Sequence, residues 1–296
     1  MNERAALSLV GGLVDHAGDD AAVVDGTVVT TDMLHDRTDF PAGTTRYTAG
    51  WRAVGASLSD VAATGAEATG AVAVYAAPDF EESELREFLQ GATDVCEAVG
   101  AEYVGGDLDT HQEFTVATTA LGRTDDPVGR SGAEPGDRLC VSGALGRSGA
   151  ALRLFEAGET DRANELFRFE PRVAAGLALA EHATAMMDSS DGLARSCHQL
   201  AEASEVGLAL DGDAVPVDSA VHEVAADEAT VRELAWYFGE DFELVCTVPE
   251  HAVEDARADC PVALSVVGEV TDGDDGDPAV SIDGEALSDR GFTHGE

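Results

Sequence analysis

The sequence predicts an α/β fold of mixed sheets arranged in two domains. Strand-like and helix-like segments alternate along all 296 residues, and a chain of this length can form two domains of ordinary size. A glycine-rich crossing over residues 129–149 separates the two halves. We therefore expect an N-terminal domain over residues 1–135 and a C-terminal α/β domain over residues 136–296.

In the first half, the β-branched run TVVTTDML predicts a strand at 27–34. Small residues fill 46–64, which favours a helix that packs closely on a sheet. In 81–99, apolar residues recur at helical spacing over about five turns. Further strands are expected at 70–77, 102–107 and 114–122.

The second half repeats this alternation. An apolar run over 183–187 predicts a buried strand that ends at Asp188. The acidic segment 271–278 has the composition of a solvated loop. We expect helices at 148–157, 171–182, 191–203 and 218–236, and further strands at 206–211, 242–248 and 263–270.

The charge of the chain restricts its partners. There are 58 acidic and 17 basic residues, and every basic residue is an arginine, so the formal charge is -41. Such a surface repels nucleic acid and anionic membranes, and molar salt suppresses the repulsion. The absence of lysine excludes a Walker A kinase and Schiff-base chemistry. From this charge we expect a protein adapted to a salty cytoplasm. We expect no membrane segment, because no long apolar run or signal peptide is evident.

Carboxylates recur beside apolar segments, often with glycine or hydroxyl neighbours. A single acid of this kind is more often a helix cap or a turn residue, but the recurrence favours a shared purpose. Charges beside buried segments are costly unless they are paired, and Mg²⁺ prefers such oxygen ligands together with phosphates. The acids lie in GDDAAVV (Asp20), TTDML (Asp32), SLSDVAATG (Asp60), VGGDLD (Asp107) and MMDSSDGL (Asp188 and Asp191).

Taken in order, the motifs resemble the thiamine-monophosphate kinase family, which belongs to the aminoimidazole ribonucleotide synthase superfamily. The resemblance covers nearly the whole chain, and SDGL and GEDFEL favour this family over its relatives. The motifs that carry it are GDDAAVV, TTDML, WRAVGASLSDVAATGA, VGGD, GRSGAEPGD, VSGALGRSGAAL, MDSSDGLARS, FGEDFEL and RGF.

The resemblance implies a homodimer joined through the N-terminal sheet, with ATP and Mg²⁺ between the partner and the two domains. It implies catalytic roles for Asp191 and Arg130, nucleotide contacts at Gly106, Asp107, Arg130 and Ser190, and substrate contacts at Glu240 and Phe292. The metal ligands that it implies are Asp20, Thr30, Thr31, Asp32, Asp60, Asp107, Asp188 and Asp191.

The implied reaction transfers the γ-phosphoryl group of ATP directly to thiamine monophosphate. The second pKa of the acceptor phosphate is about 6, so its attacking oxygen needs no strong base at neutral pH. One position departs from the family: Asp39 stands where a substrate-contacting His is usual. His35 or Arg37 could replace that contact, or Asp39 could face the cationic thiazolium ring.

Two other functions stay open from the sequence. The chain could be another ATP-using member of the superfamily, one that forms an acyl phosphate or selenophosphate. Against this, the first cysteine is Cys96, and the chain ends in FTHGE and not in a cysteine-bearing tail. The chain could also be a sensor that binds ATP or thiamine phosphates without turnover, although a sensor would need fewer acids.

Overall fold

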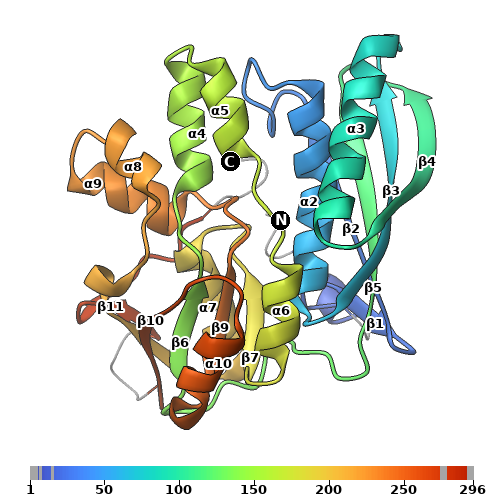
Figure 1. The fold of residues 1–296 in the computed structure, drawn as a ribbon. Helices are drawn as coiled ribbons and strands as arrows, with labels where there is room; N and C mark the ends of the chain where they lie inside the picture. The colour runs from blue at the N-terminus through green and yellow to red at the C-terminus, as the bar shows by residue number, and fades with distance from the viewer. Residues whose placement is uncertain (1–5, 7–8, 15–16, 274–278, 292–296) are drawn as a thin grey trace.

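The computed structural model describes residues 6, 9–14, 17–273 and 279–291 and contains two mixed sheets (Figure 1). The five-stranded sheet has the order β1-β2-β5-β3-β4, in which only β3 and β4 pair in parallel. Its elements are β1 (Ala22–Val24), β2 (Thr27–His35), α2 (Arg46–Ala63), β3 (Glu67–Ala77), α3 (Glu82–Ala98), β4 (Glu102–Thr110) and β5 (Thr115–Arg123).

The seven-stranded sheet has the order β12-β11-β8-β10-β6-β9-β7. The mixed α/β fold class is therefore confirmed. The elements of this half are β6 (Arg138–Ser142), α4 (Arg147–Glu156), α5 (Thr160–Phe167), α6 (Val173–Ala180), β7 (Ala185–Asp188), α7 (Leu193–Ser204), β8 (Gly207–Leu210), η1 (Gly212–Ala214), α8 (Ser219–Val224), α9 (Glu228–Arg232), η2 (Glu233–Tyr237), β9 (Leu244–Val248), η3 (Glu250–Ala252), α10 (Val253–Asp259), β10 (Leu264–Thr271), β11 (Val280–Ile282) and β12 (Glu285–Ala286).

Helix α2 is the central element that the two halves share. Thr45 caps its first turn by accepting a hydrogen bond from the backbone N–H of Thr48. Its small residues allow neighbours to approach closely. A Cβ on Gly91 of α3 would lie 2.0 Å from the carbonyl oxygen of Tyr47, and one on Gly176 of α6 would lie 2.1 Å from that of Ala62. Both glycines are therefore required by helix packing.

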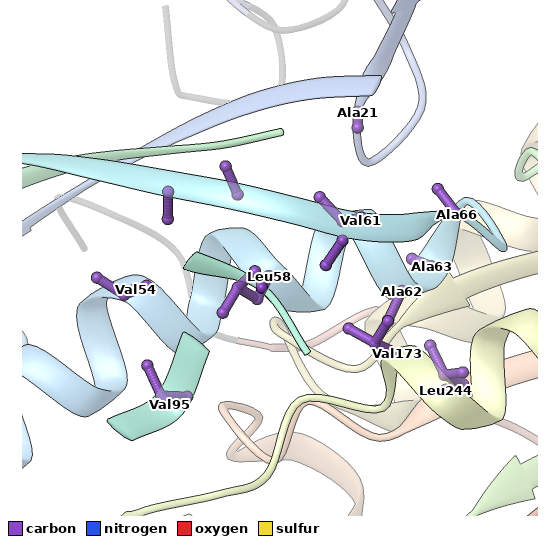
Figure 2. Packing of buried hydrophobic residues seen from close by; sticks show 14 of the residues in the cluster. Ala21, Val54, Leu58, Val61, Ala62, Ala63, Ala66, Val95, Val173 and Leu244 are labelled. Atoms are coloured by element: carbon purple, nitrogen blue, oxygen red, sulfur yellow. The ribbon is translucent and has the colours of Figure 1, made fainter. Parts of the chain in front are cut away.

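The largest hydrophobic core forms around α2 (Figure 2). Val54, Leu58 and Val61 of this helix are fully buried, and the same cluster includes Val173 and Leu244 from the second half. Burial of this apolar surface fixes α2 against both sheets, at roughly 25 cal/mol per Å² removed from water. Side chains on the polar edge of α2 are thereby held at the junction of the two halves.

One face of the five-stranded sheet carries α2 and α3 (Figure 1), whereas the other exposes apolar side chains. The register places Val29 opposite Leu121 and Val74 opposite Ala117, and Met33 also pairs with Ala117, so these side chains share one face. Met33 is 54% exposed. Such an exposed apolar patch is typical of an interaction surface. Among the described helices, none has both the length and the apolar character needed to cross a bilayer.

One helix expected in the second half is wrong, and one strand was not expected. The single helix expected at 218–236 is divided into α8, α9 and the π-helical η2. Asp218 and Asp227 each cap a separate helix start, because their side chains accept from the N–H groups of Ala220 and Thr230. Strand β6 was not expected within the glycine-rich crossing, yet it pairs with both β9 and β10. Part of the predicted acidic loop, 274–278, lies outside the described residues.

Candidate active site

Three carboxylates from separate segments meet where the two halves join. Asp20 precedes β1, Asp60 lies in the last turn of α2, and Asp188 ends β7. One carboxylate oxygen of each lies within 4.8 Å of the others. We call Asp20, Asp60 and Asp188 the carboxylate cluster. The sequence placed all three among its candidate metal ligands, and the fold brings them together.

Hydroxyl groups orient the cluster and a fourth acid beside it. Thr30 donates to Asp60 at 2.5 Å, and Ser59 donates to Asp188 at 2.6 Å. Ser57 donates to Asp32 at 2.7 Å. Thr30 and Asp32 alternate with Thr31 along β2, so they face α2 together. These hydrogen bonds hold the acids in fixed positions inside a buried region.

Nearby positive charge, from Arg130, balances only part of the negative charge of the carboxylate cluster. Arg130 reaches Asp20 with Nη2 at 2.9 Å and Nε at 3.3 Å, and its backbone N–H donates to Asp19 at 2.7 Å. Burial tends to lower the pKa of Arg130, but Asp20 raises it above its ordinary value.

The pKa values of the cluster show the same excess charge. Burial, with the charges of Asp32, Asp188 and Asp20, raises the pKa of Asp60 well above its usual range. Burial and Asp20 raise the pKa of Asp188 to about 7. Buried acids in this state favour a proton or a cation. A divalent cation with oxygen ligands fits this donor set, because the carboxylates are already close together.

The loop after β7 connects the cluster to a second loop of the C-terminal half. The N–H of Ser190 donates to Asp188 at 3.2 Å, and the N–H of Glu240 donates to the carbonyl oxygen of Ser190 at 2.6 Å. A Cβ on Gly239 would lie 2.5 Å from that same oxygen, so only glycine permits this approach. The predicted nucleotide residue Ser190 and the predicted substrate residue Glu240 are therefore adjacent.

Asp191 and the C-terminal segment lie on the other side of this loop. A Cβ on Gly291 would lie 2.3 Å from the carbonyl oxygen of Asp191. Asp191 itself is partly exposed and does not belong to the carboxylate cluster. Phe292, the other predicted substrate contact, lies outside the described residues.

Three predicted residues lie away from the cluster. The hydroxyl of Thr31 faces the uncovered side of the sheet and donates to the carbonyl oxygen of Thr118 at 2.7 Å. Gly106 and Asp107 lie on the edge strand β4, which the order β2-β5-β3-β4 separates from β2 by roughly 14 Å. Both line a cavity of about 370 Å³ with Tyr75, Phe88 and Leu89. Within one chain, the cluster and this cavity are therefore separate.

Asp39 has a role in the fold of its own loop. It is buried, and its Oδ2 accepts from the N–H of His35 at 2.7 Å and from the hydroxyl of Thr38 at 2.8 Å. Arg37 extends outward, with its side chain 81% exposed. A contact of Asp39, His35 or Arg37 with substrate stays a prediction.

The sequence interpretation missed three residues that organise the site: Arg52, Ser57 and Ser59. All three lie on α2, where small polar residues are common and carry little information by themselves. The available signal was helical spacing, because Arg52 and Ser59 are seven residues apart and so lie on one face of the helix.

Comparison with known proteins identifies the family. The thiamine-monophosphate kinase of Halobacterium salinarum is 65% identical over 294 residues, which cover 99% of this chain and 100% of that protein. The chain belongs to the thiamine-monophosphate kinase family. The enzyme of that name from Methanospirillum hungatei is 37% identical, with 99% of both chains covered.

Domain and structural comparisons agree with this family. The N-terminal domain of AIR synthase related proteins matches residues 18–124, and their C-terminal domain matches residues 134–281. The structure of AaThiL complexed with AMPPCP and TMP superimposes with a TM-score of 0.87 at 26% identity, over 99% of this chain and 97% of that one. The structure of the Stenotrophomonas maltophilia thiamine-monophosphate kinase superimposes with a TM-score of 0.80 at 28% identity, over 95% of this chain and 96% of that one.

Proposed function

We propose that this protein transfers the γ-phosphoryl group of ATP to the phosphate of thiamine monophosphate, with Mg²⁺ as cofactor. The observation that carries the proposal is the buried carboxylate cluster joined through Ser190 to Glu240. The relative solved with AMPPCP and TMP supports the choice of an ATP-like donor and this acceptor.

Each group of the site has a defined task in this reaction. An acceptor phosphate oxygen attacks the γ-phosphorus, the bond from phosphorus to the bridging oxygen of ADP breaks, and thiamine diphosphate and ADP result. Bound Mg²⁺ would offset the charge of the carboxylates and the phosphates. Arg130, held by Asp20, supplies a fixed positive charge beside the cluster. Because the acceptor is already largely anionic at neutral pH, positioning and charge neutralisation dominate catalysis.

A homodimer completes the proposed site. One chain keeps Asp107 and its cavity away from the cluster, and its five-stranded sheet exposes an apolar face. Pairing two such faces would bury this surface and could bring β4 of the partner subunit toward the cluster. We therefore assign Gly106 and Asp107 to the nucleotide site of the neighbouring chain.

The test is an assay with Mg²⁺, ATP and thiamine monophosphate in molar KCl, which screens the charge of -41. We expect thiamine diphosphate and ADP in equal amounts, and no product with excess EDTA. ADP without the diphosphate would favour another reaction of the superfamily. Tight ATP binding without turnover would favour a sensor. Undiminished ATP binding in EDTA would contradict the proposed role of the metal.

A further inference from the structure

Arg52 extends from α2 into the loop that carries Glu240. Its guanidinium is buried, with the whole residue 3% exposed, and its Nη2 lies 2.8 Å from Oε2 of Glu240. Nη2 also lies 3.4 Å from the carbonyl oxygen of Glu240, and Nη1 donates to that of Phe167 at 2.5 Å. One side chain of the first half therefore contacts both the backbone and the carboxylate of Glu240.

We propose that Arg52 is a positioning residue that fixes the Glu240 carboxylate for the acceptor substrate. This inference rests on the proposed function. A charge in this place is costly, because burial lowers the pKa of Arg52 while Glu240 and Asp241 oppose that shift. Buried ion pairs seldom improve stability over apolar residues of similar size. Their better-supported use is to fix one geometry.

The surroundings hold the guanidinium in a single orientation. Its central carbon lies 3.6 Å from the ring centre of Phe167 and 5.7 Å from that of Phe242. The ring of Phe242 stacks on that of Phe169 at 4.1 Å. A planar guanidinium between aromatic rings keeps its direction better than a flexible ammonium would.

The loop that receives Arg52 has a backbone that needs support. Glu240 and Phe242 have φ values of +58° and +55°, which residues with side chains seldom adopt. Ser148 donates to the carbonyl oxygen of Glu240 at 2.6 Å, and Nη1 of Arg52 lies 3.2 Å from the same hydroxyl. Arg52 thus joins the network that maintains this conformation.

Helix α2 connects this network to the carboxylate cluster. Ser59 lies seven residues after Arg52, about 10.5 Å along the same face, and it donates to Asp188. A rigid helix therefore holds Glu240 at one end and Asp188 at the other. This arrangement fixes the distance between Glu240, the proposed contact of the acceptor, and the carboxylate cluster, the proposed site of phosphoryl transfer. In-line attack requires that this distance be fixed.

Three variants test the proposal in molar KCl: Arg52→Met, Arg52→Lys and Trp51→Phe. Trp51→Phe is the matched control, because it removes another contact between the halves, the hydrogen bond to the carbonyl oxygen of Phe169. We expect Arg52→Met to raise KM for thiamine monophosphate at least tenfold while KM for ATP changes less than twofold. Arg52→Lys should recover part of this loss, and Trp51→Phe should leave both KM values unchanged.

A double-mutant cycle with Glu240→Gln separates positioning from a general role in folding. If Arg52 acts through Glu240, adding Arg52→Met to Glu240→Gln should lower kcat/KM by less than a further twofold. Independent, multiplying losses would overturn the proposal, as would equal rises in both KM values. Failure of the wild-type protein to form thiamine diphosphate would instead contradict the proposed function, so the two failures are distinguishable.

Discussion

The hydroxyl of Ser59 on α2 donates a 2.6 Å hydrogen bond to the carboxylate of Asp188 at the end of β7. Both residues are fully buried. The bond joins a helix packed on the five-stranded sheet to a strand of the seven-stranded sheet. It also orients one member of the carboxylate cluster, so stability and activity should depend on it together.

Ser59→Ala should therefore impair both properties. Loss of the hydroxyl leaves a buried carboxylate oxygen without this donor, which costs about 1–3 kcal/mol of unfolding free energy. We expect turnover to fall about tenfold, because Asp188 is then less well oriented. Denaturant unfolding and steady-state kinetics in molar KCl measure the two effects. Ser83→Ala, which removes an exposed hydroxyl from α3 on the covered side of the sheet, is the control and should change neither.

Asp60→Asn should change stability and activity in opposite directions. Burial and the charges of Asp32, Asp188 and Asp20 raise the pKa of Asp60, so its ionised form is unfavourable when no cation is present. Removing it should raise the melting temperature of the protein in EDTA and lower turnover by about 100-fold or more. The exposed Asp79→Asn is the control. A lower melting temperature for Asp60→Asn in EDTA would show that these carboxylates do not repel one another.

Asp107 should act on the cluster of the partner subunit. Asp60→Asn and Asp107→Asn should each be inactive alone, because each damages both sites of a dimer. Mixed after dissociation and reassociation, they should recover about a quarter of wild-type activity, since half the dimers are mixed and one site in each is intact. A mixture as inactive as its components would mean that Asp107 acts within its own chain or that subunits do not share sites.

The sequence indicated the members of the cluster but not all of its geometry. Its members were recognisable because each lies beside an apolar segment, where an unpaired charge is costly. These members are Asp20, Asp60 and Asp188. The separation of Asp107 was not predictable, since it follows from the order β2-β5-β3-β4. That order depends on pairing between strands distant in the sequence, which local patterns do not encode.

Residues that support the site were harder to predict than those that form it. In the sequence, Ser59 resembles any small helix residue, and only the structure shows that it contacts Asp188. Arg52 likewise resembles a surface base, and only the structure shows that it contacts Glu240. Strand β6 was obscured by the glycines around it, although its partners β9 and β10 bury it in the sheet. In each case the deciding interaction comes from a segment that is distant in the sequence.

Asp241 gives the protein a pH dependence of stability with a definite sign. Its carboxylate accepts from the N–H groups of Gly146 and Ser148, at 2.5 and 2.9 Å, and so caps α4. Burial nevertheless raises its pKa to about 7. In the unfolded chain the pKa is about 3.9, so between these values the folded state holds a proton that the unfolded state lacks. This contribution to stability is complete below about pH 4 and is lost as the pH rises to about 7.

Asp241→Asn removes that titration and tests the sign. We expect the unfolding free energy of the wild type, relative to the variant, to increase by up to about 1.4 kcal/mol for each unit as the pH falls from 7 to 5. Denaturant unfolding in molar KCl with EDTA measures it. Asp227→Asn is the control: hydrogen bonds from Thr230 lower the pKa of Asp227, so its titration lies below this window. A difference that is constant with pH, or that decreases on acidification, would show that Asp241 is ionised in the folded protein throughout this range.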